Sequence, residues 1–289
     1  MKVELIKPQG YCAGVMNAIK IAGQAKKEHP NKDISVIGML VHNEQVVKEL
    51  DEQGIKTINL DKDGNLPSTL KKGDVVIFSA HGHDEKLDEQ AKNKSLIIYD
   101  CTCPIVRLNL QKIKDEVKRN HQIIYIGQKG HRETEAALSL SKNIALYDIN
   151  SGLDFSLIKD ASPLVINQTT LNFISLKEIH QEIKQVLPQS RIEDEICNAT
   201  RERQEAILKI ENDTDLIIVV GDKKSSNCNK LYDIAKTKFL NAFVYLIGNI
   251  DELKQIDLTN KKKAAVSSGA STPISIVNEI YNYLLNYQR

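Results

Sequence analysis

The chain has 289 residues and carries 39 Lys and Arg against 38 Asp and Glu, a formal net charge of +1 at pH 7. This balance, with 5% aromatic residues and no Trp, argues against nucleic-acid binding. The longest apolar runs, at 216–220 and 242–247, are too short to span a bilayer. Five cysteines, an odd number, and the lack of a signal-peptide pattern favour a reduced, cytoplasmic protein over a disulfide-linked secreted one.

Apolar, β-branched runs alternate with helical patterns along the whole chain, which predicts an α/β fold with parallel strands and right-handed crossovers. The expected strands are 2–6, 34–37, 74–78, 96–98, 122–126, 164–166, 190–196, 215–220, 243–247 and 264–266. The expected helices are 15–27, 46–50 with Gly54 as its cap, 104–117, 173–186, one that follows Cys197 and one opened by Pro273.

Three cysteines, Cys12, Cys103 and Cys197, each lie where a predicted strand gives way to a predicted helix, and they are spaced 91 and 94 residues apart. Polar loops recur after each of them at similar distances, so the chain has an internal period of about 92 residues. We therefore expect three pseudo-threefold-related α/β units, at 1–100, 101–190 and 191–289. Because ligands bind beyond the carboxyl ends of parallel strands, the three cysteines should meet at a common centre.

This arrangement predicts that the cysteines act as thiolates, since the N–H groups at a helix N-terminus stabilise a thiolate. A single cysteine is more often a small buried apolar residue, but three in the same context are harder to explain that way. No Cys-x-x-Cys or His-x-x-x-His pair indicates structural zinc. Three thiolates fit a [4Fe–4S] cluster with one iron open to a ligand. We prefer Cys103 to Cys101 as the ligand because Pro104 makes Cys103 the helix N-cap.

Polar side chains in the strand-end loops predict an anion site beside these cysteines. Helix N-termini with hydroxyl and amide groups bind phosphate, although ordinary N-capping is the alternative reading. No Walker or Gly-x-Gly-x-x-Gly loop is present, so electrons for redox chemistry would come from outside. Glu133 is the best candidate acid, unless it only complements a helix dipole. The loop residues are His42, His81, His83, His131, Ser225, Ser226, Asn227 and Ser271, with His83 as a possible solvated neighbour.

These motifs together resemble the LytB-type 4-hydroxy-3-methylbut-2-enyl diphosphate reductases, in family order and over nearly the whole chain. The motifs are Gly10 to Val15, Val41-His42-Asn43, Ser79 to Gly82, Thr102-Cys103-Pro104, Gly130 to Glu133, Gln168-Thr169-Thr170, Ser225-Ser226-Asn227 and Ser267 to Ser271.

The resemblance implies reductive removal of the substrate's C4 hydroxyl to give isopentenyl and dimethylallyl diphosphate, the last step of the non-mevalonate isoprenoid pathway. It implies that Cys12, Cys103 and Cys197 hold the cluster, whose open iron binds the substrate oxygen. Glu133 would deliver protons, helped by Thr170, and a ferredoxin or flavodoxin would supply electrons. The implied diphosphate ligands are His42, His81, Ser225, Ser226, Asn227 and Ser271, with His131 close to that end.

Four positions depart from the family pattern: Arg132 stands where Pro is usual, Glu44 where a basic residue is common, and Cys101 and Cys228 are extra thiols. None of them removes an implied ligand or the acid.

Two other functional classes remain open when only the residues are considered. A non-catalytic iron–sulfur sensor would not turn over substrate, and a non-redox hydro-lyase would act without an electron donor.

Overall fold

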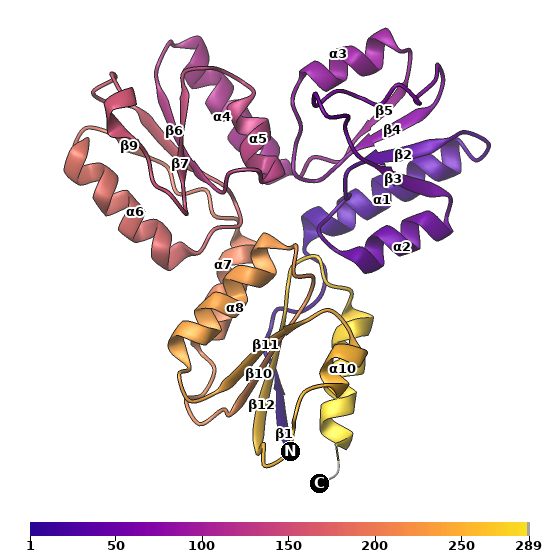
Figure 1. The fold of residues 1–289 in the computed structure, drawn as a ribbon, viewed down its shortest axis with the longest axis vertical. Helices are drawn as coiled ribbons and strands as arrows, with labels where there is room; N and C mark the ends of the chain where they lie inside the picture. The colour runs from indigo at the N-terminus through magenta and orange to yellow at the C-terminus, as the bar shows by residue number, and fades with distance from the viewer. Residues whose placement is uncertain (288–289) are drawn as a thin grey trace.

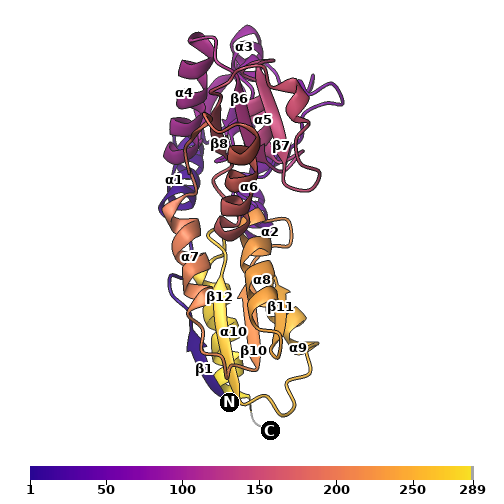
Figure 2. The same ribbon diagram turned by 90° about the vertical axis from the view of Figure 1, so that its left-hand side faces the viewer.

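The computed structural model describes residues 1–287 and contains three separate four-stranded sheets. Every strand pair within these sheets is parallel, as the sequence predicted. Figure 1 shows the sheets and their helices as three lobes around a common centre. The side view in Figure 2 shows that the molecule is thin in the third direction, so the lobes lie side by side rather than stacked. The expected α/β architecture is confirmed.

The first lobe has the strand order β3-β2-β4-β5. Its central strands have the sequences ISVI and VVIF and are buried along their whole length. Continuous apolar strands of this kind are typical of a parallel sheet covered on both faces. The elements are α1 (Ala13–Glu28), β2 (Ile34–Ile37), α2 (Glu44–Glu52), β3 (Ile55–Ile58), β4 (Val75–Phe78), α3 (Lys86–Asn93) and β5 (Ile97–Asp100).

The second lobe repeats this scheme with the order β7-β6-β8-β9. The strand expected over 190–196 is reduced to two residues, because the charged run after Ile192 leaves the sheet. The elements are α4 (Pro104–Lys118), β6 (Ile123–Gly127), α5 (Arg132–Leu138), β7 (Ile144–Asp148), the 3-10 turn η1 (Phe155–Leu157), β8 (Leu164–Asn167), α6 (Phe173–Val186) and β9 (Arg191–Ile192).

The third lobe has the order β1-β12-β10-β11, so its sheet combines the first strand of the chain with three of the last. Lys2 to Leu5 of β1 align in parallel with Lys263 to Val266 of β12. The elements are β1 (Lys2–Leu5), α7 (Asn198–Leu208), β10 (Leu216–Val220), α8 (Ser226–Lys238), β11 (Phe243–Ile247), α9 (Ile250–Lys254), β12 (Lys263–Ser268) and α10 (Ile274–Asn286).

Each sheet carries an apolar core on both of its faces. In the first lobe, Val75 and Ile77 pack under α1 and α2, whereas Val76 and Phe78 pack under α3, as the alternation of side chains along a strand requires. The other two lobes have the same pair of cores. Sheets held rigidly in this way fix the loops at their carboxyl ends, which face the centre in Figure 1. Within residues 1–287, no helix has both the length and the apolar character needed to cross a membrane.

Candidate active site

The three predicted cysteines lie at the crossings between lobes. Cys12, Cys103 and Cys197 follow the edge strands β1, β5 and β9 and are the N-caps of α1, α4 and α7, which pack in the next lobe. The backbone N–H of each donates to a carbonyl in the loop after the neighbouring strand, so one arrangement occurs three times. These bonds run from Cys12 to Ala270 (2.9 Å), from Cys103 to Ala80 (2.9 Å) and from Cys197 to Thr169 (3.1 Å).

The three thiols are free and line one central cavity of about 110 Å³. Gly14 leaves room for them, because a Cβ added there would lie 2.7 Å from the Cys103 sulfur and 3.9 Å from the Cys12 sulfur. Burial raises the pKa of Cys103, opposed by hydrogen bonds from the N–H groups of Ile105 and Val106 at the start of α4. These hydrogen bonds from the start of α4 favour the Cys103 thiolate but do not outweigh burial.

Cys101 and Cys228 do not line this cavity. The Cys101 side chain is fully buried in the core beneath α1, where its sulfur lies 3.6 Å from the Ala18 carbonyl oxygen. Burial raises the pKa of Cys101 to about 12. Cys101 comes directly after β5, which ends at Asp100, whereas Cys103 is the N-cap of α4, so only Cys103 lines the cavity. Cys228 is fully buried at the start of α8, and burial raises its pKa to about 11.

Glu133 is a buried carboxyl group at the edge of the cavity. It is 2% exposed and lies in the first turn of α5, where the N-cap His131 accepts a hydrogen bond from its N–H. Its two oxygens accept from the Thr169 N–H at 2.8 Å and the Thr169 hydroxyl at 2.9 Å, and the Tyr125 hydroxyl also donates to it. Burial raises the pKa of Glu133 to about 7, against the opposing effect of these donors. A group with such a pKa exchanges protons readily at neutral pH.

Three histidines from two lobes gather on the other side of the cavity. The ring centres of His42 and His81 lie 4.2 Å apart, and His131 lies 5.6 Å and 5.9 Å from them. Burial lowers the pKa of all three, to about 3 for His131, and the nearby Arg132 lowers it further. The rings are therefore neutral at pH 7. Both ring nitrogens of His42 are buried without a partner, so they are free for a ligand.

The third lobe supplies hydroxyl and amide groups from the start of α8 and the loop after β12. Ser225 is the N-cap of α8, and both polar atoms of the Asn227 side chain are buried without a partner. The Ser226 hydroxyl lies 3.2 Å from that of Thr170 in the second lobe. The Ser271 hydroxyl donates to the His42 carbonyl at 3.0 Å. Orphaned buried polar atoms beside a helix N-terminus suit an anionic ligand.

The first and third lobes are also joined just outside the cavity, at the start of α2. Asp222 accepts a hydrogen bond from the Glu44 N–H at 2.9 Å, and Lys224 pairs with the Glu44 carboxylate at 2.8 Å. Glu44, which departs from the family pattern, thus contacts the third lobe. These contacts hold the segment that carries His42 against the lobe that carries Ser271.

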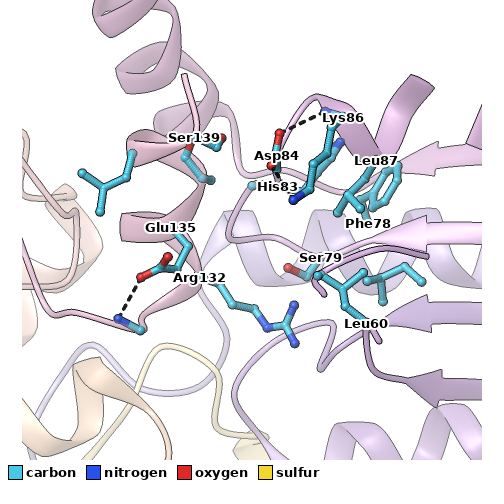
Figure 3. A pocket seen from close by; sticks show the side chains of 16 residues that line it. Leu60, Phe78, Ser79, His83, Asp84, Lys86, Leu87, Arg132, Glu135 and Ser139 are labelled. Carbon is cyan, nitrogen blue, oxygen red and sulfur yellow. Dashed lines mark hydrogen bonds and ion pairs between the residues drawn. The ribbon is translucent and has the colours of Figure 1, made fainter. Parts of the chain in front are cut away.

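Arg132 crosses from α5 to the first lobe. Its guanidinium lies against Gly38, at the end of β2, where even a methyl group would collide with it. Together with Ser79, His83 and Lys86 it lines a second cavity of about 610 Å³, which Figure 3 shows between the first two lobes. His83 belongs there and not to the centre, because it stacks on Phe78 at 3.7 Å and bonds to Asp88. The strand-end position alone did not distinguish it from the other histidines.

The central cavity thus brings together every residue singled out from the sequence except His83. Sequence reasoning missed Thr169, whose side chain and N–H both bind Glu133, and the buried Tyr125 behind it. Only the position of Thr169 beside Thr170 gave any signal. The residues brought together are Cys12, Cys103, Cys197, Glu133, Thr170, His42, His81, His131, Ser225, Ser226, Asn227 and Ser271.

The thiols suit a metal cluster better than a single metal ion. Among the described residues, no group of three or more His, Cys, Asp or Glu side chains is arranged to hold one ion. The three cysteines nevertheless face the same cavity, each at a helix N-terminus, and the glycine at position 14 keeps the space between two of the sulfurs clear. An iron–sulfur cluster bridges thiolates over a longer span than one ion does, so this donor set fits it.

Comparison with known proteins assigns the chain to a family. The profile described as LytB protein matches residues 3–285. The chain belongs to the LytB family. Among its relatives, the 4-hydroxy-3-methylbut-2-enyl diphosphate reductase of Malacoplasma penetrans is 35% identical over 98% of this chain and 97% of its own length. The enzyme of the same name from Symbiobacterium thermophilum is 37% identical over 99% of this chain and 98% of its own length.

Solved structures of LytB proteins share the fold. The E-1-hydroxy-2-methyl-but-2-enyl-4-diphosphate reductase of Plasmodium falciparum superposes with a TM-score of 0.88 at 33% identity, covering 99% of this chain and 88% of its own. A structure described as (E)-4-hydroxy-3-methyl-but-2-enyl diphosphate reductase, the terminal enzyme of the non-mevalonate pathway, gives a TM-score of 0.69 at 27% identity, covering 99% and 100%. The resemblance noted from the motifs is confirmed at the level of the family.

Proposed function

We propose that this LytB protein reduces (E)-4-hydroxy-3-methylbut-2-enyl diphosphate to isopentenyl and dimethylallyl diphosphate, the last step of the non-mevalonate pathway. The reaction breaks the C4–oxygen bond, consumes two electrons and two protons, and releases water. The observation that carries the proposal is the single cavity in which three free thiols, a buried acid and a set of unpartnered polar groups meet. The names of the relatives support the same reaction.

Cys12, Cys103 and Cys197 would hold a [4Fe–4S] cluster, one per chain. When bound, this group would supply the electrons for C–O cleavage and a Lewis-acidic iron for the substrate hydroxyl. Each of the three cysteines is the N-cap of a helix, where unpaired backbone N–H groups point toward the cluster position. We propose three units, 1–100, 101–190 and 191–289, each of which would provide one ligand, although β1 of the first unit belongs to the sheet of the third lobe.

Glu133 would be the proton donor. Its pKa, raised by burial to about 7, leaves about half of the groups protonated at neutral pH, and Thr169 fixes both oxygens in place. Thr170 lines the cavity two residues beyond Gln168, whose side-chain amide donates to its hydroxyl at 2.9 Å. With its hydroxyl also close to Ser226, Thr170 would relay protons between Glu133 and the substrate.

The diphosphate would lie among the neutral histidines and the donors of the third lobe. No Lys or Arg among the described residues lines the cavity, so binding would rest on hydrogen bonds and helix N-termini rather than on direct ion pairs. The single N–H of the neutral His42 ring and the side-chain NH₂ of Asn227 would find acceptors in phosphate oxygens. The full set of ligands would be His42, His81, His131, Thr170, Ser225, Ser226, Asn227 and Ser271.

An external carrier, a ferredoxin or flavodoxin, would deliver the electrons, because no nucleotide- or flavin-binding loop is present in the sequence. The five free thiols suit a reducing compartment, for which we propose the cytoplasm.

An anaerobic turnover assay tests the proposal. The reconstituted protein is given the hydroxylated diphosphate with reduced methyl viologen, and both isoprenoid products are measured by mass spectrometry. We expect product formation that depends on the reductant. Substrate loss without reductant would indicate a hydro-lyase instead, and no substrate loss by iron-loaded protein would indicate a non-catalytic sensor.

A further inference from the structure

Arg203 is a buried cation between two of the three cysteine segments. It lies on α7, six residues after Cys197, and is 3% exposed. One terminal nitrogen, Nη2, donates to the Gly10 carbonyl at 2.7 Å, and the other, Nη1, donates to the Ala199 carbonyl at 2.9 Å. Gly10 precedes Cys12 by two residues, and Ala199 follows Cys197 by two. The guanidinium therefore joins two thiol-bearing segments, whose cysteines are 185 residues apart in sequence (197 − 12).

The charge of Arg203 has no carboxylate partner. No ion pair to it is formed within residues 1–287, and its Nε is buried without a hydrogen-bond partner. The adjacent Glu202 is exposed on the other side of the helix. Burial lowers the pKa of Arg203, while Cys12, Cys228, Glu202 and Cys197 act in the opposite direction. Inside the protein, the sulfurs of Cys12 and Cys197 would stabilise the guanidinium charge when they are thiolates, whereas the Cys228 thiol, with a pKa of about 11, is neutral at pH 7.

A buried charge is costly unless an opposite charge compensates it. The two carbonyls satisfy part of the hydrogen bonding of Arg203, but they do not neutralise it. The opposite charge must come from the centre, where three thiolates converge when a cluster is bound. By contrast, Arg201 on the same helix pairs with Asp194 at 2.6 Å in a partly exposed position.

We propose that Arg203 is a positioning residue for the cluster, and that its fixed positive charge, bound to the segments that carry Cys12 and Cys197, stabilises the reduced form. This inference rests on the proposed function, since it takes a cysteine-ligated cluster as the partner. Reduction adds one negative charge to a site surrounded by low-dielectric protein, so a nearby cation raises the reduction potential. The two carbonyl contacts also fix the spacing between the segments that carry the two cysteines.

The test compares Arg203→Met, which removes the charge, with Arg203→Lys, which keeps it, and with Arg201→Met as the matched control on the same helix. Each holoprotein is reconstituted anaerobically, its iron and sulfide are counted, and its midpoint potential is measured by a redox titration followed by electron paramagnetic resonance. We expect Arg203→Met to weaken the one-electron reduction at least tenfold, a fall of about 59 mV. Arg203→Lys should stay closer to the parent, and Arg201→Met should match the parent.

Every outcome decides the inference. Loss of iron from Arg203→Met but not from Arg203→Lys, with native circular dichroism in both, also supports a requirement for the charge. Full iron and an unchanged potential in Arg203→Met overturn the proposal. Equal loss of iron from both variants overturns the proposed role of the charge. It would show that only the hydrogen bonds from Arg203 to the Gly10 and Ala199 carbonyls are required. A parent protein that takes up no iron contradicts the proposed function itself, which separates the two failures.

Discussion

Replacing Glu133 by Gln should abolish most turnover and at the same time stabilise the protein at neutral and alkaline pH. The buried carboxyl group has a pKa of about 7, against a usual value of 4.5. The folded state therefore holds a proton that the unfolded chain has lost between pH 4.5 and 7. Stability falls as the pH rises through that window, and the full penalty is present above pH 7. Glutamine carries no charge and is free of this penalty.

The size of the effect follows from the difference between the two pKa values. About 2.5 pH units correspond to about 3 kcal/mol of unfolding free energy, which the variant should regain above pH 7 and not at pH 4.5. For a chain of this length that is a rise in Tm of about 6 °C. Loss of a general acid should lower kcat about 100-fold or more, because no other buried carboxyl lines the cavity among the described residues.

The assay is anaerobic calorimetry of parent and variant at pH 5 and pH 8, together with turnover under reduced methyl viologen. Glu135→Gln is the control, because Glu135 lies on the same helix with its side chain exposed. We expect the control to show no pH-dependent gain. A Tm gain of Glu133→Gln that is the same at both pH values would refute the electrostatic reasoning, and turnover near that of the parent would refute the catalytic role.

Three further predictions concern the surroundings of this acid and the cysteines. Cys101→Ala should keep the iron of the parent after anaerobic reconstitution and Cys103→Ala should lose the intact cluster, because only Cys103 faces the cavity; iron counts in the reverse order would exclude this assignment. Tyr125→Phe removes a hydrogen-bond donor from the Glu133 carboxylate, so the pKa of Glu133 should rise above 7. The alkaline limb of the pH profile of kcat should then move up by about one pH unit, and a limb that does not move contradicts this prediction. Asp222→Asn weakens the hydrogen bond that holds α2, by about 1.5 kcal/mol, and should raise KM about tenfold with little change in kcat, which steady-state kinetics would detect or exclude.

The parts of the fold that the sequence predicted well are those dictated by burial. Strands β2 and β11 were predicted with their observed ends, and β10 with one extra residue, because each is a run of almost entirely apolar residues. The edge strands β3 and β7 were missed. In β3, the sequence IKTI buries only Ile55 fully and mixes polar residues into the run, so it lacks the signal of a central strand.

The centre was predictable because the chain repeats one pattern three times, so that equivalent loops had to meet. What the pattern did not contain were contacts set by the relative placement of the lobes. Thr169 rather than Thr170 binds Glu133 because β8 lies beside β6 at a particular register. The burial of Arg203 and the half-buried position of Arg132 were equally hidden, since arginine in a helical pattern is normally a surface residue.

The pairing of β1 with β12 also dictates the order of events during synthesis. The strand at residues 2–5 leaves the ribosome 261 residues (263 − 2) before its partner strand at residues 263–268 begins, because Lys2 pairs with Lys263. At about 5–20 residues per second, β1 waits roughly 13–50 s for its neighbour. Cys12, whose N–H is bonded by Ala270, reaches its final place only then. The first two lobes can fold before β12 is made, but the proposed cluster can be loaded at the centre only after translation has passed β12.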